Sequence, residues 1–557
     1  MVRFFLKHDK SSIIPDTTLD FLILIGFVIN FIALFTQLMD QDSAMYASIA
    51  KHMVVSNDWI NLFSDGKDWL DKPHLPFWIT AFSFKLFGIS SFTYKLPSFV
   101  IWSVGVIYLY KLGSRIYSPV VAKLSIVIYM TSLHVILSNY DVRAEGYLTS
   151  FIIASTYYIY LIYKGNGNLY LLPAAFFAAM AVMTKGIFFL AVIASGFVIY
   201  WMITRQWNEF TKIRWWLLIV LTFVLISPEL YCLYLQFDLH PEKVVFGRQG
   251  ASGIRFFFWD SQFGRFLDTG PIKGSGDPFF FFHTLLWAFL PWTIFLISAT
   301  VSYLRNLNKR VIGESAIIAI TALISLLVFS ASRFQLPHYI VILHPHFALI
   351  SAAWLVQVRS PKLFRLLKAG MWVIFIGIVM IVALLAFFYK FEKPAVIIVG
   401  ILLLCVALII FYNKNSLSET IRIGVVSAAV LSIFIYSFLY AELMRYDAGM
   451  IAAQWINKNK PGSERIVFDC QNFPFDFYSD SEVQYRTNIQ PEDVRNDNVI
   501  IFTPDTSLAK IDTAYYSVEV LKKFEYFHIT TLKKEFIDKR TRSGETSLYT
   551  VAKIVKK

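Results

Sequence analysis

The 557-residue chain is 57% hydrophobic and 17% aromatic, and only 16% of its residues are charged, whereas soluble domains carry about 25% charged residues. This composition excludes a soluble globular protein and indicates a polytopic membrane protein. The net charge of +13 does not indicate nucleic-acid binding, because most of the excess Lys and Arg lies in short loops between apolar segments, where these residues fix membrane topology. The three cysteines provide neither a disulfide framework nor the spacing of zinc ligands.

The apolar segments predict an α-helical bundle of about thirteen spans, each needing about 20 apolar residues. The first segment follows a basic N-terminus and has no small-residue cleavage site after it, so we expect it to remain as an anchor. In chain order the expected spans lie near 20–39, 97–113, 121–138, 147–163, 168–183, 187–204, 215–235, 279–303, 312–330, 338–356, 370–389, 394–412 and 420–443.

The basic loops predict the orientation of the bundle. "KLGSRIYSPVVAK", "RQWNEFTKIR", "RNLNKR" and "VRSPKLFRLLK" alternate along the chain in the way that places the N-terminus in the cytoplasm. Two long loops, 40–96 and 236–278, then face the outer side. In the first of these, "SAMYASIAKHMVV" and "LPFWITAFSFKLFG" have helical spacing of apolar residues, and we expect amphipathic helices that lie in the membrane interface.

The tail differs in character from the bundle. "RIVFDC", "NVIIFTP" and "SLYTVAKIV" are short runs typical of strands, and "AGMIAAQWINKNKPG" is typical of a helix that ends at Pro-Gly. We therefore expect two parts: a transmembrane part, 1–446, and a small α/β domain, 447–557, on the periplasmic side.

Charged residues gather at the predicted outer ends of several spans. Ionisable groups at a membrane boundary are costly and are candidates for function. Cations there could bind a phosphate at headgroup depth, and a carboxylate could accept a proton from an attacking hydroxyl or amine. Simple salt bridges are the alternative. The acids are Asp40, Asp42, Asp71, Asp141, Glu145 and Asp260; the cations are Lys72, Arg143, Lys185, Arg265, Arg333 and the pair Lys390 and Lys393.

Several motifs resemble, in order and over nearly the whole chain, a family of GT-C fold membrane glycosyltransferases. These are "DSAMYASIAKHM", "DWLDKPHLPFWITAFSFKLFG", "MTKGI", "WDSQFGRFL", "FLPW" and "SRFQLPHYIVILHP". The family contains the protein O-mannosyltransferases and the aminoarabinose transferases of lipid A. The resemblance implies a GT-C bundle with a catalytic first outer loop and a polyprenyl-phosphate sugar donor, such as an undecaprenyl phosphate sugar.

The resemblance also implies which acids are catalytic. Asp42 aligns with the catalytic Asp of an Asp-Glu pair, but Ser43 stands in the place of the Glu. Asp40 could compensate, or could simply cap the helix that follows. Glu145 aligns with a second acidic position, with Asp141 as its competitor and Arg143 able to pair with either.

Three residues are implied to bind the donor phosphate: Lys72, Arg265 and Tyr339. We expect both cations to meet on one phosphate, in a cavity that Asp42 also lines. The alternatives are that Lys72 pairs only with Asp71, and that Arg265 packs against Asp260 or Asp268. Gln335 stands where the family has a Lys, and Arg333 could supply the missing charge. Lys185 recurs in the family, with helix-end structure or phosphate approach as its role.

Together these features predict an inverting glycosyltransferase of the bacterial inner membrane that acts on its outer face. It would pass a sugar from a polyprenyl phosphate to a lipid, glycan or protein acceptor. The alternatives are a polymerase or oligosaccharide transferase with a diphosphate-linked donor, a lipid-linked sugar flippase, and a non-catalytic sensor. A transporter would favour polar residues at mid-span and an inverted repeat. No cofactor is required, although a divalent metal could take part.

Overall fold

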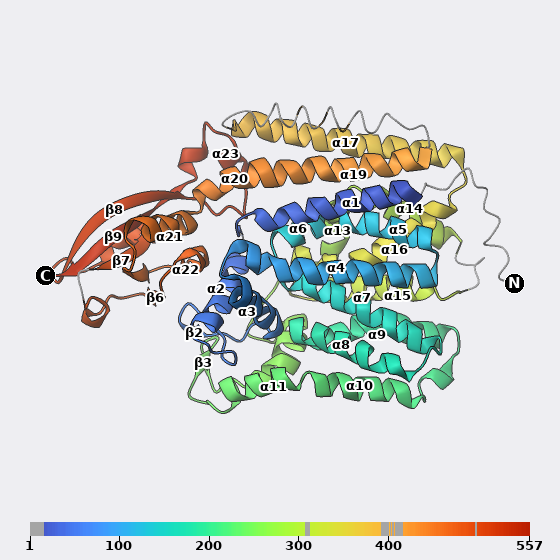
Figure 1. Ribbon diagram of the computed structural model, residues 1–557, viewed down its shortest axis with the longest axis horizontal. Helices are drawn as coiled ribbons and strands as arrows, with labels where there is room; N and C mark the ends of the chain where they lie inside the picture. Colours follow the sequence, from blue (N-terminus) through green and yellow to red (C-terminus); the bar gives the residue numbers. More distant parts are fainter. Residues whose placement is uncertain are drawn as a thin grey trace.

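The structure is a computed structural model, and it describes residues 16–39, 41–306, 312–391, 400, 403, 406, 416–495 and 498–557. Most of these residues belong to a helical bundle whose long helices run side by side (Figure 1). The helices of the bundle are α1 Asp16–Ile32, α4 Ser91–Ile116, α5 Pro119–Met130, α6 Leu133–Tyr140, α7 Ala144–Tyr163, α8 Leu171–Lys185, α9 Phe188–Ile203, α10 Ile213–Leu225, α11 Ser227–Leu233, α13 Phe280–Ala288, α14 Thr293–Arg305, α15 Ala316–Ala331, α16 His344–Gln357, α17 Pro361–Tyr389, α19 Ser416–Phe434 and α20 Tyr440–Leu443.

Six of the described helices are long and apolar enough to cross a membrane, and up to eight cross it if each of two bent pairs is one span. The bent pairs are α5 with α6, at 58°, and Ile213–Leu225 with Ser227–Asp238, at 40°. α17 exposes large apolar side chains, among them Val373 at 69% and Phe387 at 70%, as a lipid-facing helix does. The chain is a multi-pass membrane protein. The number thirteen stays a prediction, and the expected span 394–412 lies largely outside the described residues.

The first long loop forms two helices, α2 (Gln41–Val55) and α3 (Leu75–Phe87), joined through the hairpin of β1 (Phe63–Ser64) and β2 (Lys67–Asp68). α3 exposes Phe82, Leu86 and Phe87, as an interfacial helix would. α2 differs from the expectation of an amphipathic interfacial helix, because most of its residues from Ser43 to Met53 are buried. Its small residues allow close packing against protein on several sides.

The second long loop follows the π-helix η6 (Tyr234–Asp238), which continues α11. It contains a hairpin of β3 (Val244–Val245) and β4 (Arg248–Gln249), then α12 (Gly253–Arg255) and a second π-helix, η7 (Phe256–Gly264). The chain then returns to the bundle at α13.

The C-terminal part contains a five-stranded mixed sheet in the order β6-β5-β7-β9-β8. β5 pairs in parallel with both β6 and β7, whereas β9 pairs antiparallel with β7 and β8. Phe475 and Phe502, both fully buried, stack in its core. The elements are α21 Ala448–Asn459, β5 Glu464–Phe468, α22 Phe473–Tyr478, β6 Val483–Arg486, β7 Val499–Pro504, β8 Tyr516–Tyr526, α23 Lys534–Ile537 and β9 Ser547–Lys556. The division at 447 and the side of the membrane stay predictions.

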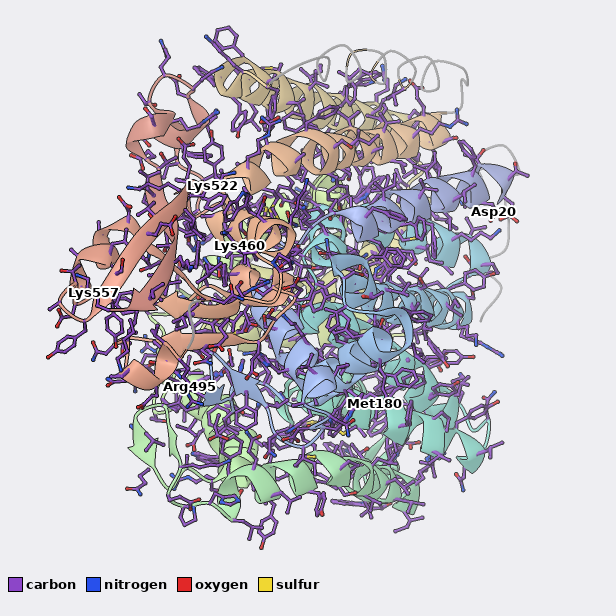
Figure 2. The ribbon with its side chains drawn as sticks, turned by 60° about the vertical axis from the view of Figure 1, so that its left-hand side comes forward. Asp20, Met180, Lys460, Arg495, Lys522 and Lys557 are labelled. Atoms are coloured by element: carbon purple, nitrogen blue, oxygen red, sulfur yellow. The ribbon has the colours of Figure 1, made fainter. Side chains whose placement is uncertain are left out.

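The sheet and the two long loops lie at the same end of the bundle. Figure 1 shows α2, α3, β2 and β3 at the end where the C-terminal strands lie, and α22 packs against α2. Figure 2 shows Lys460, Lys522 and Lys557 on the C-terminal part, far from Asp20 in α1. The two long loops and the C-terminal sheet therefore lie together at one end of the bundle.

Candidate active site

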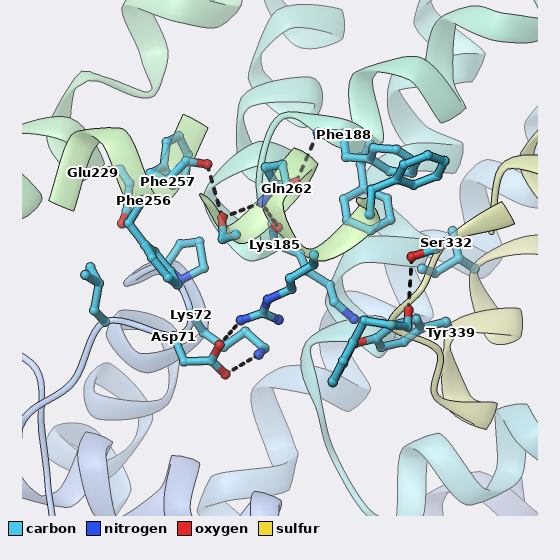
Figure 3. A pocket seen from close by; sticks show the side chains of 18 of the residues that line it. Asp71, Lys72, Lys185, Phe188, Glu229, Phe256, Phe257, Gln262, Ser332 and Tyr339 are labelled. Carbon is cyan, nitrogen blue, oxygen red and sulfur yellow. Dashed lines mark hydrogen bonds and ion pairs between the residues drawn. The ribbon is translucent and has the colours of Figure 1, made fainter. Parts of the chain in front are cut away.

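An open cavity with an empty volume of about 870 Å³ lies at the loop end of the bundle. One wall is charged: it carries Lys72 of the first loop, Lys185 at the end of α8, and Arg265 directly after η7 (Figure 3). Tyr339, from the short helix η9 (Pro337–Leu343), completes this wall. The cavity also has many aromatic lining residues: Phe188, Phe189, Phe256, Phe257, Phe266, Phe329 and Phe334. The cavity therefore suits a ligand with an anionic head and an apolar body.

The carboxylate of Asp71 joins the two predicted phosphate-binding cations. One oxygen lies 2.5 Å from the Lys72 ammonium, and the other accepts a hydrogen bond from the guanidinium of Arg265. The two loops that supply these groups are far apart in sequence, and the structure brings them together as expected. The local pairing of Lys72 with Asp71 is also present. Asp260 instead pairs with Arg255, at 3.7 Å.

The side chains of Lys72 and Arg265 are 14% and 12% exposed, and both stay protonated. Burial opposes the charged form of Lys72, but the phenols and carboxylates around it, first among them Tyr46, hold its pKa above the ordinary value. Burial lowers the pKa of Arg265, from a starting value so high that the guanidinium stays protonated. Burial also raises the pKa of Tyr46 to about 12. The wall thus presents fixed positive charge to the cavity.

Glu145 pairs with Lys185 rather than facing the cavity. Its side chain is 3% exposed and accepts a hydrogen bond from the Lys185 ammonium, which also lies 3.7 Å from the ring centre of Tyr339. The second acidic position of the sequence is therefore in contact with one other predicted site residue, Lys185, and it orients that lysine towards Tyr339.

Gln262 is a site residue that the sequence analysis did not single out, although it lies in "WDSQFGRFL". Its amide donates to the carbonyl of Lys185, at 3.1 Å, and accepts from the N–H of Phe188, at 3.4 Å. Gly186 permits this approach, because its φ is +110° and a Cβ there would lie 2.0 Å from the amide nitrogen of Gln262. Gln262 therefore ties η7, which leads to Arg265, to the end of α8.

Asp42 lies at the start of α2 and its side chain is 52% exposed. Arg143 is 3.3 Å from Asp42, 3.3 Å from Asp141 and 3.0 Å from Nδ1 of His338. Nε2 of His338 is 3.6 Å from Glu145. A continuous chain of charged and polar groups therefore links Asp42 to the cavity wall. His338, adjacent to Tyr339 in a quoted motif, was not identified from the sequence.

Two expectations about this region need correction. Asp42 is not among the residues that line the cavity; it pairs with Arg143, which also contacts His338. Arg333 does not replace the charge missing at Gln335, because its side chain is exposed and outside the cavity. Its backbone instead accepts from the N–H of Gly276, at 2.7 Å, and Gln335 accepts from the N–H of Asp277, at 2.8 Å.

Two acids remain from the sequence analysis, Asp141 and Asp40. Asp141 accepts a hydrogen bond from the Ser43 hydroxyl besides pairing with Arg143. Asp40 lies outside the described residues. Within the ranges that the structure describes, no group of three or more His, Cys, Asp or Glu side chains is placed to hold a metal ion.

Comparison with known proteins gives matches along most of the chain. The family model "Dolichyl-phosphate-mannose-protein mannosyltransferase" matches residues 71–232. The undecaprenyl phosphate-alpha-4-amino-4-deoxy-L-arabinose arabinosyl transferase of Pseudomonas paraeruginosa is 26% identical over 365 residues, which is 63% of this chain and 62% of that protein. The corresponding transferase of Enterobacter sp. is 26% identical over 363 residues, 63% of this chain and 61% of that protein. The match thus spans somewhat less than two thirds of these relatives.

The fold comparison extends over nearly the whole chain. The crystal structure of ArnT from Cupriavidus metallidurans bound to undecaprenyl phosphate superposes with a TM-score of 0.72 at 15% sequence identity, covering 96% of this chain and 97% of that one. The same protein in the apo state gives a TM-score of 0.69. The chain therefore has the GT-C fold of the membrane glycosyltransferases.

Proposed function

We propose that the protein is a glycosyltransferase that moves a sugar from a polyprenyl-phosphate donor to an acceptor on the periplasmic face of the bacterial inner membrane. The observation that carries the proposal is the convergence of Lys72 and Arg265 on one carboxylate, at the wall of a cavity that is rich in aromatic side chains. The relatives that are named as undecaprenyl phosphate-dependent arabinosyl transferases support it.

The cations bind the donor phosphate in this proposal. A phosphate oxygen takes a place beside the Asp71 carboxylate, within reach of both Lys72 and Arg265, and Tyr339 of η9 lines the same cavity. When the bond between the anomeric carbon and the phosphate oxygen breaks, negative charge grows on the phosphate. Fixed cations in a partly buried wall stabilise that charge without having to reorganise.

Asp42 is the proposed general base. Its carboxylate is half-exposed, so an acceptor arriving from outside the bundle can reach it, and it pairs with Arg143 at 3.3 Å. The acceptor hydroxyl or amine gives its proton to Asp42, a bond forms to the anomeric carbon, and polyprenyl phosphate leaves from the opposite face with inversion. Glu145 acts indirectly, by holding Lys185 against Tyr339.

The charge at the wall favours a monophosphate donor over a diphosphate. Lys72 and Arg265 share one carboxylate, Asp71, and Lys185 is matched by Glu145. Glu229 also lines the cavity but pairs with His74, at 3.0 Å. The five remaining groups carry three positive and two negative charges, which leaves one positive charge for the ligand. A diphosphate-linked donor would bring more negative charge than this wall compensates.

The test is binding and turnover by the purified protein in detergent or nanodiscs. We expect undecaprenyl phosphate to bind much more tightly than undecaprenol, which has the same chain and no phosphate. Equal affinities for the two lipids would refute the proposed site. Mass spectrometry of lipids and glycoproteins from a deletion strain would then show whether the acceptor is a lipid, a glycan or a protein, and which sugar is transferred.

A further inference from the structure

The short helix α22 of the C-terminal part packs against α2, the helix that carries Asp42. The Lys51 side chain of α2 is 9% exposed, and its ammonium donates to the backbone carbonyls of Asp476, at 2.6 Å, and Ser479, at 2.7 Å. These carbonyls lie at the end of α22, where helix carbonyls lack partners within the helix and a cation is stabilising. The neighbouring His52 lies 3.2 Å from the Asp476 carboxylate.

The same segment also holds the chain just before α2 begins. The Tyr478 hydroxyl accepts a hydrogen bond from the N–H of Leu38, at 2.9 Å, and lies 2.9 Å from the Ser91 hydroxyl at the start of α4. α22 therefore contacts the first loop on both sides of Asp42: at Leu38, shortly before it, and at Lys51, about 13 Å further along the helix axis. Figure 1 shows α22 beside α2 at this junction.

We propose that the C-terminal domain positions Asp42 for transfer, through a clamp that consists of Lys51 on α2 and of Asp476 and Tyr478 on α22. This inference rests on the proposed function of Asp42. The three clamp residues are positioning residues, since none lines the donor cavity. The C-terminal domain is accordingly a part of the catalytic apparatus, beyond any contact that it makes with acceptors.

The burial of the Lys51 ammonium explains why the clamp can fix the position of α2 as well as stabilise the fold. A lysine ammonium taken out of water must be surrounded by acceptors, and removing them leaves an uncompensated buried charge. The carbonyls that meet Lys51 have fixed geometry because α22 is packed into the domain core through Phe475. α2 is a continuous helix, so the contacts at Lys51 and at Leu38 together restrict the position of its first turn, which carries Asp42. An error of about 1 Å in a reacting group can lower turnover about 100-fold.

The test compares three full-length variants. Lys51→Met keeps the length of the side chain and removes the ammonium, and Tyr478→Phe removes only the hydroxyl that holds Leu38. Arg486→Met is the matched control, because it breaks an ion pair with the buried Asp493, at 2.7 Å, within the same domain and away from the first loop. For each variant we would measure kcat, the KM for donor, the Kd for undecaprenyl phosphate and thermal unfolding.

We expect Lys51→Met and Tyr478→Phe to lower kcat by about 10-fold or more while the Kd for undecaprenyl phosphate stays within about 2-fold of wild type. Arg486→Met should lower thermal stability with kcat unchanged. Wild-type kcat in folded Tyr478→Phe and Lys51→Met protein would overturn the inference. So would a parallel loss of kcat in all three variants, because that result indicates a general effect of destabilising the domain.

Backbone hydrogen exchange gives a readout that does not depend on activity. Tyr478→Phe should raise exchange at residues 38–46, and Arg486→Met should not. Unchanged exchange at 38–46 in Tyr478→Phe would overturn the clamp even if the substrate were unknown. Failure of the proposed function looks different: the wild-type protein would then bind undecaprenyl phosphate no better than undecaprenol, whatever the clamp variants do.

Discussion

The shared carboxylate of Asp71 leads to a quantitative prediction for the two cations. A charge-assisted hydrogen bond contributes about 1.5–3 kcal/mol, so Lys72→Ala or Arg265→Ala should weaken binding of undecaprenyl phosphate by roughly 10- to 100-fold. With both cations present the trio carries one net positive charge, and with either removed it carries none. The first substitution therefore removes the net attraction, and the second leaves Asp71 as an uncompensated negative charge that repels the phosphate.

The double variant should accordingly bind undecaprenyl phosphate more weakly than the product of the two single effects implies, because either cation alone still neutralises Asp71. Additivity would be expected only if the two residues acted on separate groups. The assay is a double-mutant cycle on the Kd for undecaprenyl phosphate, with undecaprenol as the reference lipid. Lys243→Ala is the control, because this lysine pairs with Asp68, at 2.8 Å, in the same region and outside the cavity. Fully additive losses, or single effects below about 2-fold, would refute the shared-phosphate geometry.

Three further outcomes are expected. Asp42→Asn should lower kcat by roughly 100- to 10,000-fold, the usual effect of losing a general base, with donor binding retained. The buried pair of His74 and Glu229, at 3.0 Å and 0% exposed, should make stability depend on pH: burial alone would lower the pKa of His74, but Glu229 raises it above 6.5. The stabilisation is then complete below pH 6.5 and is lost as pH rises through the folded-state pKa, so thermal unfolding should occur at lower temperature in alkaline buffer. A reporter enzyme that works only in the periplasm should be active when it is fused after Lys557, and a reporter that works only in the cytosol should be inactive there.

Each of these outcomes has a control or a contrary result. Near wild-type turnover by Asp42→Asn would remove the base from this position. Glu229→Gln should abolish the alkaline loss of stability, because the carboxylate that raises the pKa of His74 is gone, whereas Glu242→Gln, at an exposed pair with His240, should leave the profile unchanged. A reporter active only in the cytosol would reverse the orientation and with it the outer-face mechanism.

The sequence predicted the cations of the site better than it predicted their surroundings. Lys72, Arg265 and Tyr339 lie in motifs whose order and spacing are recognisable, and the structure brings all three to one cavity. The role of Asp71 as a bridge could not be predicted, because it depends on where η7 ends relative to the first loop. Gln262 was within a recognised motif, yet its contact with Gly186 arises only from the close approach of two distant segments.

The first loop shows why a periodic pattern can mislead. The apolar spacing of α2 indicates a helix with a face to bury, but it does not distinguish a membrane interface from another part of the protein. Here the partner of α2 is α22, more than 400 residues later in the chain, and no local pattern identifies such a pairing. The sequence analysis did not single out Lys51, which the structure surrounds with backbone carbonyls.

The same reasoning explains how so many charges can be placed at the end of an apolar bundle. An unpaired buried charge is strongly destabilising. In the structure each site cation lies beside a carboxylate: Lys72 and Arg265 share Asp71, and Lys185 pairs with Glu145. Such pairing holds the cations in place before any donor arrives, so the donor phosphate meets a wall that is already organised. The single uncompensated charge of that wall then attracts one anionic group, and the aromatic side of the cavity accepts the lipid that carries it.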